Sequence, residues 1–216
     1  MLLVVLVQFS DIKLIVFDFD GTLAKTTKYA KRFFEKTMKH EMDVKKYFGP
    51  PTKVMIKNLI KDYNLKISEE QFYNDWAKNY LDYVSKRKII TKTTINAIKK
   101  LKTKGYKLAI ITSSKRKKLK ILMPQNFYNL FDLILGSEDY LAGKPNPESL
   151  NKLLKIMKTN HKNCVYIGDN IRDIEFAKKA NVFSIGKEDY LYSEKELSRA
   201  GADKTIKSIK DLFKLI

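Results

Sequence analysis

Cysteine is nearly absent from this sequence, since Cys164 is the single one among 216 residues. One thiol can form neither an intrachain disulfide nor a cysteine-based metal site, and the apolar run around Cys164 predicts a small buried side chain. Proline and glycine are also scarce, with 5 and 8 residues. Their scarcity excludes collagen-like and low-complexity chains. Hydrophobic residues make up 44% of the sequence, which is enough for a packed globular protein.

Long hydrophobic runs are also missing. The opening segment MLLVVLVQF is apolar, but it is far shorter than the roughly 20 residues that a membrane-spanning helix needs. It also lacks the basic start and the small-residue cleavage site of a secretory signal. We therefore expect a cytoplasmic protein that does not insert into a membrane. Residues 1–10 form an apolar extension of unclear role, which could be an extra strand, a dimer contact or a segment upstream of the true start.

Acidic residues are few relative to basic ones. The 24 Asp and Glu stand against 43 Lys and Arg, which gives a formal net charge of +19. Such a charge attracts phosphorylated small molecules, anionic lipids and nucleic acids. The basic runs carry no convincing pattern of interleaved aromatic residues, so solvated basic helix faces are the favoured interpretation and nucleic-acid binding is the less favoured one. The sequence leaves both a monomer and a homodimer open.

Short apolar runs rich in β-branched residues alternate along the chain with amphipathic segments. Each run stops at polar or glycine residues, as a buried parallel strand does. Two amphipathic segments end at Gly105 and Asn181, residue types that are common just after a helix. This alternation predicts an α/β fold with a Rossmann-like, mostly parallel sheet and helices on both faces. The expected strands are 13–18, 107–112, 132–136, 164–169 and 182–186, and the expected helices are 93–104, 147–158 and 171–180.

Residues 25–90 interrupt this alternation, because every periodic segment between them is helical. Apolar stripes begin at Ala30, Met55 and Phe72, and the segment from Ser68 to Gln71 matches the capping-box pattern that opens a helix. The sequence therefore predicts an inserted all-helical domain over 25–90 and a discontinuous core domain over 11–24 and 91–216.

Two aspartates follow the first expected strand, in the segment DFDGTL that starts at Asp18. Ligands bind at the carboxyl edge of a parallel sheet, and Asp18 and Asp20 would both project there. Gly21 permits a tight turn, and Thr22 can cap or donate to a phosphate oxygen. Two close carboxylates repel unless a cation or a phosphate group shares the site. One can then act as a nucleophile and the other as an acid or base, whereas a plain strand-to-loop turn is the less favoured interpretation.

The hexapeptide resembles the first motif of the haloacid dehalogenase superfamily, whose phosphatase members form an aspartyl-phosphate intermediate. Three further motifs follow in order: Thr112 at the end of a strand, Lys144 in GKPNPE, and the acidic pair in the segment from Gly168 to Asp173. The resemblance covers the chain from Lys13 and implies a Mg²⁺ cofactor. The roles it implies are Asp18 as nucleophile, Asp20 as general acid and base, Thr112, Ser113 and Lys144 as phosphate-binding residues, Asp18, the backbone carbonyl of Asp20 and Asp169 as metal ligands, and Asp173 as support for the metal site.

Physical arguments accompany these roles. Pro145 favours an extended Lys144, and Asn146 and Pro147 suit the N-cap and the first position of the next helix. A lysine held in this way can neutralise both a phosphate group and the carboxylate that attacks it. Asp169 ends a strand beside the start of a helix and offers the hard oxygen ligand that Mg²⁺ prefers.

Some positions stay open between two roles. With Asn170 as N-cap, Asp173 occupies the third helical position, so it could cap the helix rather than support the metal. The basic run 115–120 could face the phosphate entrance, although a solvated face is favoured. Ser113 or Ser114 would cap the helix that this run opens.

The position of the helical insertion resembles that of the cap in the phosphoglycolate phosphatase and β-phosphoglucomutase branch, and Gly49-Pro-Pro51 is similar to a Gly-x-Pro turn of that branch. Lys25 and Thr26 depart from its usual residues, so the cap hinge and the leaving-group contacts do not follow from the resemblance. The branch, together with Asp20, implies a Mg²⁺-dependent phosphatase of a small phosphorylated metabolite. Two alternatives remain: a phosphomutase of the β-phosphoglucomutase type, and a basic nucleic-acid-binding protein or polynucleotide-directed phosphatase.

Overall fold

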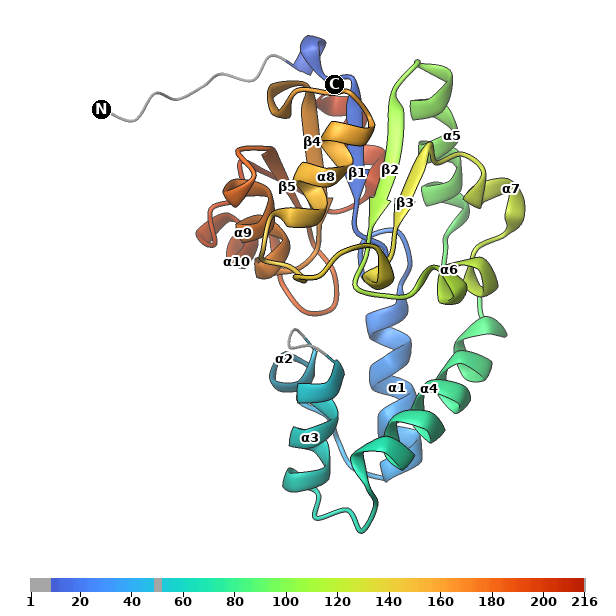
Figure 1. The fold of residues 1–216 in the computed structure, drawn as a ribbon. Coiled ribbons are helices and arrows are strands. Elements are labelled where there is room, and N and C mark those ends of the chain that lie inside the picture. The colour runs from blue at the N-terminus through green and yellow to red at the C-terminus, as the bar shows by residue number, and fades with distance from the viewer. Residues whose placement is uncertain (1–8, 49–51, 216) are drawn as a thin grey trace.

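A six-stranded sheet forms the centre of the protein in a computed structural model that describes residues 9–48 and 52–215 (Figure 1). The apolar segment 1–8 and the Gly49–Pro51 turn lie outside the described residues. The strand order is β3-β2-β1-β4-β5-β6, and each neighbouring pair is parallel. The strands are β1 Leu14–Phe17, β2 Lys107–Ile111, β3 Leu133–Leu135, β4 Cys164–Gly168, β5 Phe183–Lys187 and β6 Lys204–Ile206.

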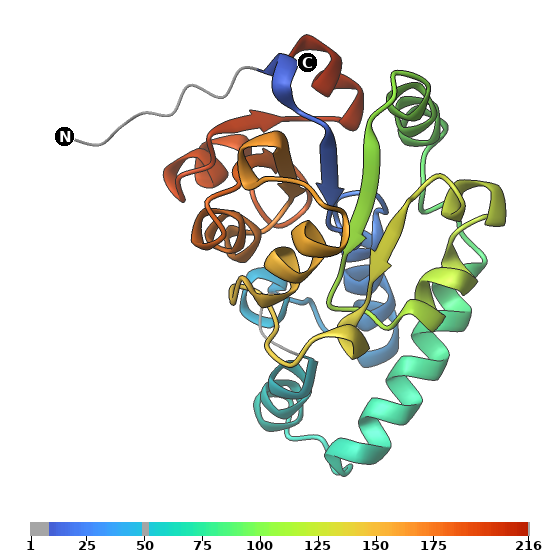
Figure 2. The same ribbon diagram turned by 45° about the horizontal axis from the view of Figure 1, so that its top comes forward.

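Strand β1 lies at the centre of the sheet and is buried on both faces. Its four residues alternate between two apolar clusters: Ile15 and Phe17 lie in one, Leu14 and Val16 in the other. The first cluster also holds side chains of α5 Lys92–Thr103, α6 Arg116–Leu122, α7 Gln125–Tyr128 and the 3₁₀ helix η4 Ile209–Lys214. The second holds side chains of α8 Glu148–Ile156 and α9 Ile171–Lys179, so helices cover both faces (Figure 2). The short α10 Glu194–Arg199 packs on β5 and β6.

The helical insertion, residues 25–90, lies beyond the carboxyl ends of the strands (Figure 1). It contains α1 Thr26–Met38, α2 Val44–Tyr47, α3 Thr52–Asp62 and α4 Glu69–Ser85. It has an apolar cluster of its own, built from Phe34, Met42, Tyr47, Met55, Ile56, Leu59 and Phe72. The predicted fold class, a parallel α/β sheet with an inserted all-helical cap domain, is thus confirmed. Its exact domain boundaries stay a prediction.

The two chain segments that join the insertion to the core lie side by side. The backbone N–H of Lys25 donates to the carbonyl of Ile89 over 2.9 Å. The hydroxyl of Tyr80, from α4, donates to the carbonyl of Thr26 over 3.1 Å. The insertion is therefore attached to the core through two chain segments, and a hydrogen bond joins these segments to each other.

Several local predictions are confirmed and two are wrong. Ser68 caps α4 by accepting the N–H of Gln71, and Gly105 and Asn181 have positive φ values of 88° and 54° after their helices. Helix α6 has Lys115 at its N-cap, whose ammonium group cannot accept a hydrogen bond, and the hydroxyl of Ser114 donates to Asp20 instead.

Helix α8 begins one residue later than predicted, at Glu148. Pro147 is the N-cap, and Asn146 still accepts the N–H of Glu148 over 3.0 Å. The predicted capping hydrogen bond therefore forms, but from a position just outside the helix.

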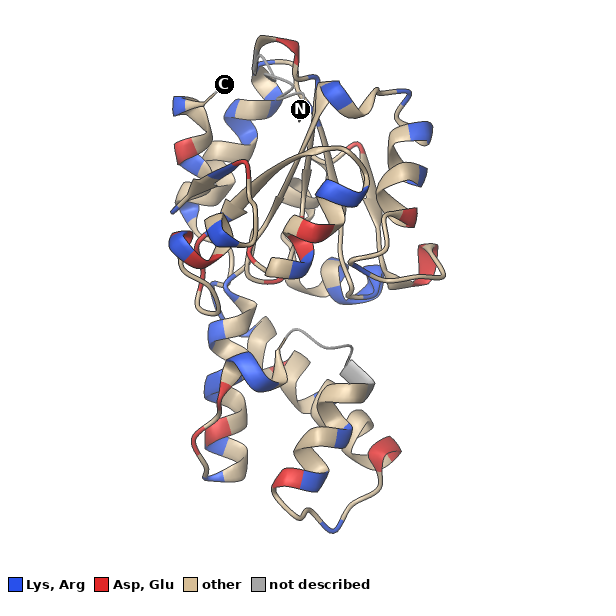
Figure 3. Cartoon of the chain, turned by 90° about the vertical axis from the view of Figure 1, so that its left-hand side faces the viewer, with Lys and Arg blue, Asp and Glu red and all other residues tan. Residues whose placement is uncertain are grey.

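The surface charge is spread over the molecule. Figure 3 shows Lys and Arg on helices of both the core and the insertion, with Asp and Glu interspersed. Within the described ranges, no helix has the combined length and apolarity that crossing a membrane requires.

Candidate active site

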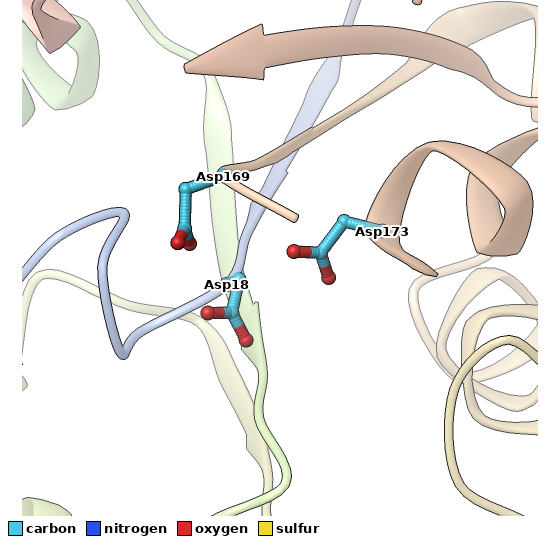
Figure 4. Close-up of side chains that lie close together, drawn as sticks. All are labelled: Asp18, Asp169 and Asp173. Atoms are coloured by element: carbon cyan, nitrogen blue, oxygen red, sulfur yellow. The ribbon is translucent and has the colours of Figure 1, made fainter. Parts of the chain in front are cut away.

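Three buried aspartates meet where two neighbouring strands end. Asp18 follows β1, Asp169 follows β4, and Asp173 lies in the first turn of α9. Figure 4 shows the three side chains close together, and one oxygen from each lies within 4.8 Å of the others. We call these three residues the carboxylate cluster. Parallel strands share their carboxyl edge, which explains why residues so far apart in the sequence come together.

Lys144 lies between two members of the carboxylate cluster. Its ammonium group donates to Asp18 Oδ1 over 2.5 Å and to Asp173 Oδ1 over 2.8 Å, and its side chain is 7% exposed. The Arg172 guanidinium donates to the backbone carbonyl of Lys144. The ammonium also lies 5.4 Å from the centre of the Tyr166 ring. These contacts hold the cation against the oxygen atoms that it neutralises.

Asp173 takes the capping role that the sequence left open and also contacts Lys144, whereas its support of a metal stays a prediction. It forms a capping box with Asn170 at the start of α9, and its Oδ1 accepts hydrogen bonds from Lys144 and from the hydroxyl of Tyr166. Gly168 makes this arrangement fit, since a Cβ at that position would lie 2.3 Å from Asp173 Cβ. Asp173 therefore caps a helix and orients Lys144 at the same time.

The loop after β1 closes tightly over Asp169. Gly21 has φ +88°, and a Cβ there would lie 2.1 Å from Asp169 Oδ2. The Thr22 hydroxyl donates to Asp169 Oδ1 over 2.8 Å, so Thr22 orients this carboxylate, where the sequence suggested a cap or a phosphate contact. Lys187 donates to the Gly21 carbonyl over 3.0 Å and fixes the loop from the other side.

Asp20 turns toward helix α6 and meets two residues whose part in the site the sequence did not reveal. Ser114 Oγ donates to Asp20 Oδ2 over 2.6 Å, and Lys118 Nζ lies 3.0 and 3.2 Å from the two carboxylate oxygens. The favoured interpretation of the run 115–120 as a solvated face is wrong for Lys118. Its place in the first turn of α6 was compatible with such a contact but did not distinguish it from an exposed side chain.

Thr112 and Ser113 follow β2 at the same edge. Thr112 is buried, and its Oγ1 accepts the N–H of Ser114 over 3.1 Å. Its backbone carbonyl accepts the hydroxyl of Tyr140 over 2.8 Å. Ser113 is exposed. Phosphate binding by either residue stays a prediction.

The electrostatics of the carboxylate cluster favour a bound cation. Burial raises the pKa of Asp18 to about 7; Lys144 opposes this shift and Asp173 adds to it. Burial also raises the pKa of Asp169 well above its usual value, and the charges of Asp18 and Asp173 raise it further. Three carboxylates in their ionised form outnumber the one ammonium group, which contacts Asp18 and Asp173, and all their ligand atoms are hard oxygens. This donor set fits Mg²⁺.

The pKa of Asp20 is shifted in the opposite direction, to a lower value. Burial alone would raise its pKa, but the ammonium of Lys118 and the hydrogen bond from Ser114 outweigh burial and hold the pKa below its usual value. The two aspartates of the DFDGTL segment thus differ in environment, as a nucleophile and an acid or base would.

A hollow of about 430 Å³ lies within the helical insertion. It is apolar in character, with Phe33, Phe72 and Trp76 among its lining residues. None of the lining residues belongs to the carboxylate cluster. We assign the active site to the cluster because, among the described residues, it is the one group of three carboxylates that lie close together, and all three are buried.

Comparisons with known proteins agree with this geometry. Residues 15–187 match the family model described as haloacid dehalogenase-like hydrolase. The chain is 32% identical over 177 residues to a phosphoglycolate phosphatase of Aquifex aeolicus, covering 78% of this chain and 81% of the relative. It is 26% identical over 223 residues to a pyrophosphatase of Halalkalibacterium halodurans, covering 95% and 97%. A crystal structure of β-phosphoglucomutase from Clostridium difficile shares the fold, with a TM-score of 0.73 at 21% identity over 93% of each chain.

Proposed function

The chain belongs to the haloacid dehalogenase-like hydrolase family, and from this premise we propose that it is a Mg²⁺-dependent phosphatase that acts on a small phosphorylated metabolite through a phosphorylated Asp18. The observation that carries the proposal is the buried Lys144 between Asp18 and Asp173, with Asp169 within reach of both. The names of relatives, phosphoglycolate phosphatase and pyrophosphatase, support a small phosphorylated substrate.

The residues divide the chemistry between them. A carboxylate oxygen of Asp18 attacks phosphorus, and a new Asp18–phosphorus bond forms as the bond to the leaving oxygen breaks. Asp20 gives a proton to that leaving oxygen. Asp20 then takes a proton from the attacking water, the Asp18–phosphorus bond breaks, and inorganic phosphate leaves. Lys144 and the Thr112 hydroxyl stabilise the phosphoryl oxygens throughout.

Asp18, the backbone carbonyl of Asp20 and Asp169 would hold the metal. When bound, Mg²⁺ would supply positive charge that screens the phosphoryl oxygens from the attacking carboxylate. Asp173 acts through Lys144, which it keeps charged and aimed at Asp18. The low pKa of Asp20 makes it a carboxylate in the resting enzyme, and the negative phosphate group of a bound substrate raises that pKa so that Asp20 can carry a proton.

The test is Asp18→Asn, assayed for phosphate release from a panel that includes phosphoglycolate and pyrophosphate, with Mg²⁺ and with EDTA. An amide cannot form the acyl phosphate, so we expect less than about a hundredth of the wild-type activity. Asp82→Asn is the matched control, because Asp82 lies on the exposed surface of α4 and pairs only with Lys86 among the ion pairs of the described residues. Near-normal activity of Asp18→Asn, or full wild-type activity in EDTA, would contradict the proposal.

The same assay addresses the phosphomutase alternative. A mutase returns the phosphoryl group to the organic product, so the ester would isomerise with little free phosphate. A phosphatase releases one phosphate for each ester consumed.

A further inference from the structure

The Asp20 carboxylate, the Ser114 hydroxyl and the Lys118 ammonium form a closed triangle of hydrogen bonds. Ser114 Oγ donates to Asp20 Oδ2 over 2.6 Å, and Lys118 Nζ lies 3.0 Å from Oδ1 and 3.2 Å from Oδ2. Lys118 also donates to Ser114 Oγ over 2.9 Å. Both carboxylate oxygens are thereby engaged, so the side chain of Asp20 cannot rotate without losing charge-assisted hydrogen bonds.

Helix α6 explains why Lys118 can reach Asp20. Lys118 lies in the first turn of this helix, and helical side chains lean toward the N-terminal end, where Ser114 and the end of β2 lie. The side chains of Lys118 and Asp20 are 26% and 30% exposed, so the pair is partly shielded from water. The neighbouring Lys115, Lys117 and Lys120 are exposed. Lys118 is thus distinguished from the rest of its basic run by direction as well as by burial.

The same lysine touches the helical insertion. Its ammonium lies 5.9 Å from the centre of the Tyr80 ring of α4, and α4 packs on α6. The Tyr80 hydroxyl donates a hydrogen bond to the carbonyl of Thr26, at the start of α1. Lys118 therefore lies at the point where insertion, α6 and Asp20 meet.

We propose that Lys118, with Ser114, is a positioning residue that holds the Asp20 carboxylate in the orientation needed for proton transfer to the leaving oxygen. The proposal rests on the proposed function, because it requires Asp20 to be the acid and base. Lys118 acts through Asp20 and makes no contact of its own with the phosphoryl group. Lys118 lies outside the four sequence motifs, so the proposal adds a new residue to the site.

The experiment begins with Lys118→Met, which keeps a long apolar side chain and removes the ammonium. With an alkyl phosphate, we expect kcat to fall by about ten- to a hundredfold with little change in KM, as for a small misplacement of a reacting group. An aryl phosphate, whose leaving oxygen needs little protonation, should lose less. Lys118→Arg should recover part of kcat, because a guanidinium can also bond both oxygens. Lys117→Met, on the exposed side of the same helix, is the matched control and should match the wild type.

A double-mutant cycle decides whether Lys118 acts through Asp20. In the Asp20→Asn background, Lys118→Met should cause no further loss, since the group it positions is already gone. Ser114→Ala should likewise lower kcat only when Asp20 is present. This variant replaces Lys118→Met in the cycle if Lys118→Met fails to fold. The Mg²⁺ affinity measured by calorimetric titration should be unchanged in Lys118→Met.

Other results would overturn the inference. They are wild-type kcat in Lys118→Met, a loss that adds fully to that of Asp20→Asn, and a rise in KM alone, which would make Lys118 a substrate contact. Failure of the proposed function looks different, because Asp18→Asn would then keep near-normal activity, or the wild type would stay fully active in EDTA.

Discussion

At the scale of single residues, Gly21 shows how an absent side chain creates room for a site. Its φ of +88° favours glycine, and Asp169 occupies the space where a Cβ would lie, at 2.1 Å. Gly105 has the same φ of +88°, but no atom lies within 4 Å of its Cβ position. A larger residue at Gly105 would therefore introduce backbone strain alone, whereas one at Gly21 would add a steric conflict with Asp169.

We predict that Gly21→Ala displaces the Asp169 carboxylate and lowers both turnover and Mg²⁺ affinity. Gly105→Ala should cost only the backbone strain, on the order of 1 kcal/mol in the free energy of unfolding, and leave turnover unchanged. Urea unfolding, phosphate release and Mg²⁺ titration of the two variants check the prediction. Equal effects on Mg²⁺ affinity from both substitutions would show that the contact with Asp169 is unimportant.

Sequence reasoning reached Asp18, Lys144, Asp169 and Asp173 because strand ends and motif order locate backbone positions. It did not reach Lys118, because a side chain in a first helical turn can point to solvent or inward, and the choice depends on how the helix lies against β1. The sequence also left Ser113 and Ser114 as alternative helix caps, whereas the negative charge of Asp20 offers the Ser114 hydroxyl a stronger partner.

At the scale of elements, five strands could be predicted because each is a buried apolar run followed by polar or glycine residues. Strand β6 was missed: it has three residues, begins with the exposed Lys204 and, among the described strands, pairs with β5 alone at the edge of the sheet. Short edge strands carry too little apolar pattern to be recognised.

The helical insertion should unfold as a unit with its own apolar cluster, as expected for a separate domain over residues 25–90. Trp76, the single tryptophan of the chain, reports on it, since its ring packs against Phe33 and Phe72. Tryptophan fluorescence therefore follows the insertion, whereas far-ultraviolet circular dichroism follows the whole chain.

We predict that Leu59→Ala destabilises the insertion by about 2–5 kcal/mol, because Leu59 is fully buried in that cluster. Val54→Ala, on the same helix at 44% exposure, should cost less than about 0.5 kcal/mol. In urea, the fluorescence transition of Leu59→Ala should shift to lower concentration than the circular dichroism transition. Coincident transitions in this variant would argue that insertion and core form a single cooperative unit.

At the scale of the whole molecule, the carboxylate cluster links stability to pH and to metal. An ordinary aspartate titrates near pH 4, whereas Asp18 has a pKa of about 7 in the folded protein. Between these values the folded state binds more protons than the unfolded state. Stability therefore falls as pH rises through this window, provided that no cation compensates the charge.

We predict that, in EDTA, the Tm of the wild type relative to that of Asp18→Asn falls as pH rises from about 5 to about 8. The comparison cancels the effect of the net charge of +19, which both proteins nearly share. Added Mg²⁺ at pH 8 should raise the wild-type Tm more than that of Asp18→Asn, because a ligand of the folded state stabilises it. Thermal scans at several pH values test this, and a difference in Tm that does not change with pH would contradict it.

The central place of β1 also has a consequence for how the protein is made. A ribosome produces β1 before its two neighbours, β2 and β4, and the whole helical insertion emerges between β1 and β2. At typical synthesis rates of about 5–20 residues per second, β1 waits on the order of ten seconds for its second partner. During that time the insertion can fold from its own contiguous residues, while the apolar strand that precedes Asp18 lacks its neighbour β4. The nascent chain thus acquires its cap before its catalytic centre, and β1 is the segment that a chaperone would have to shield.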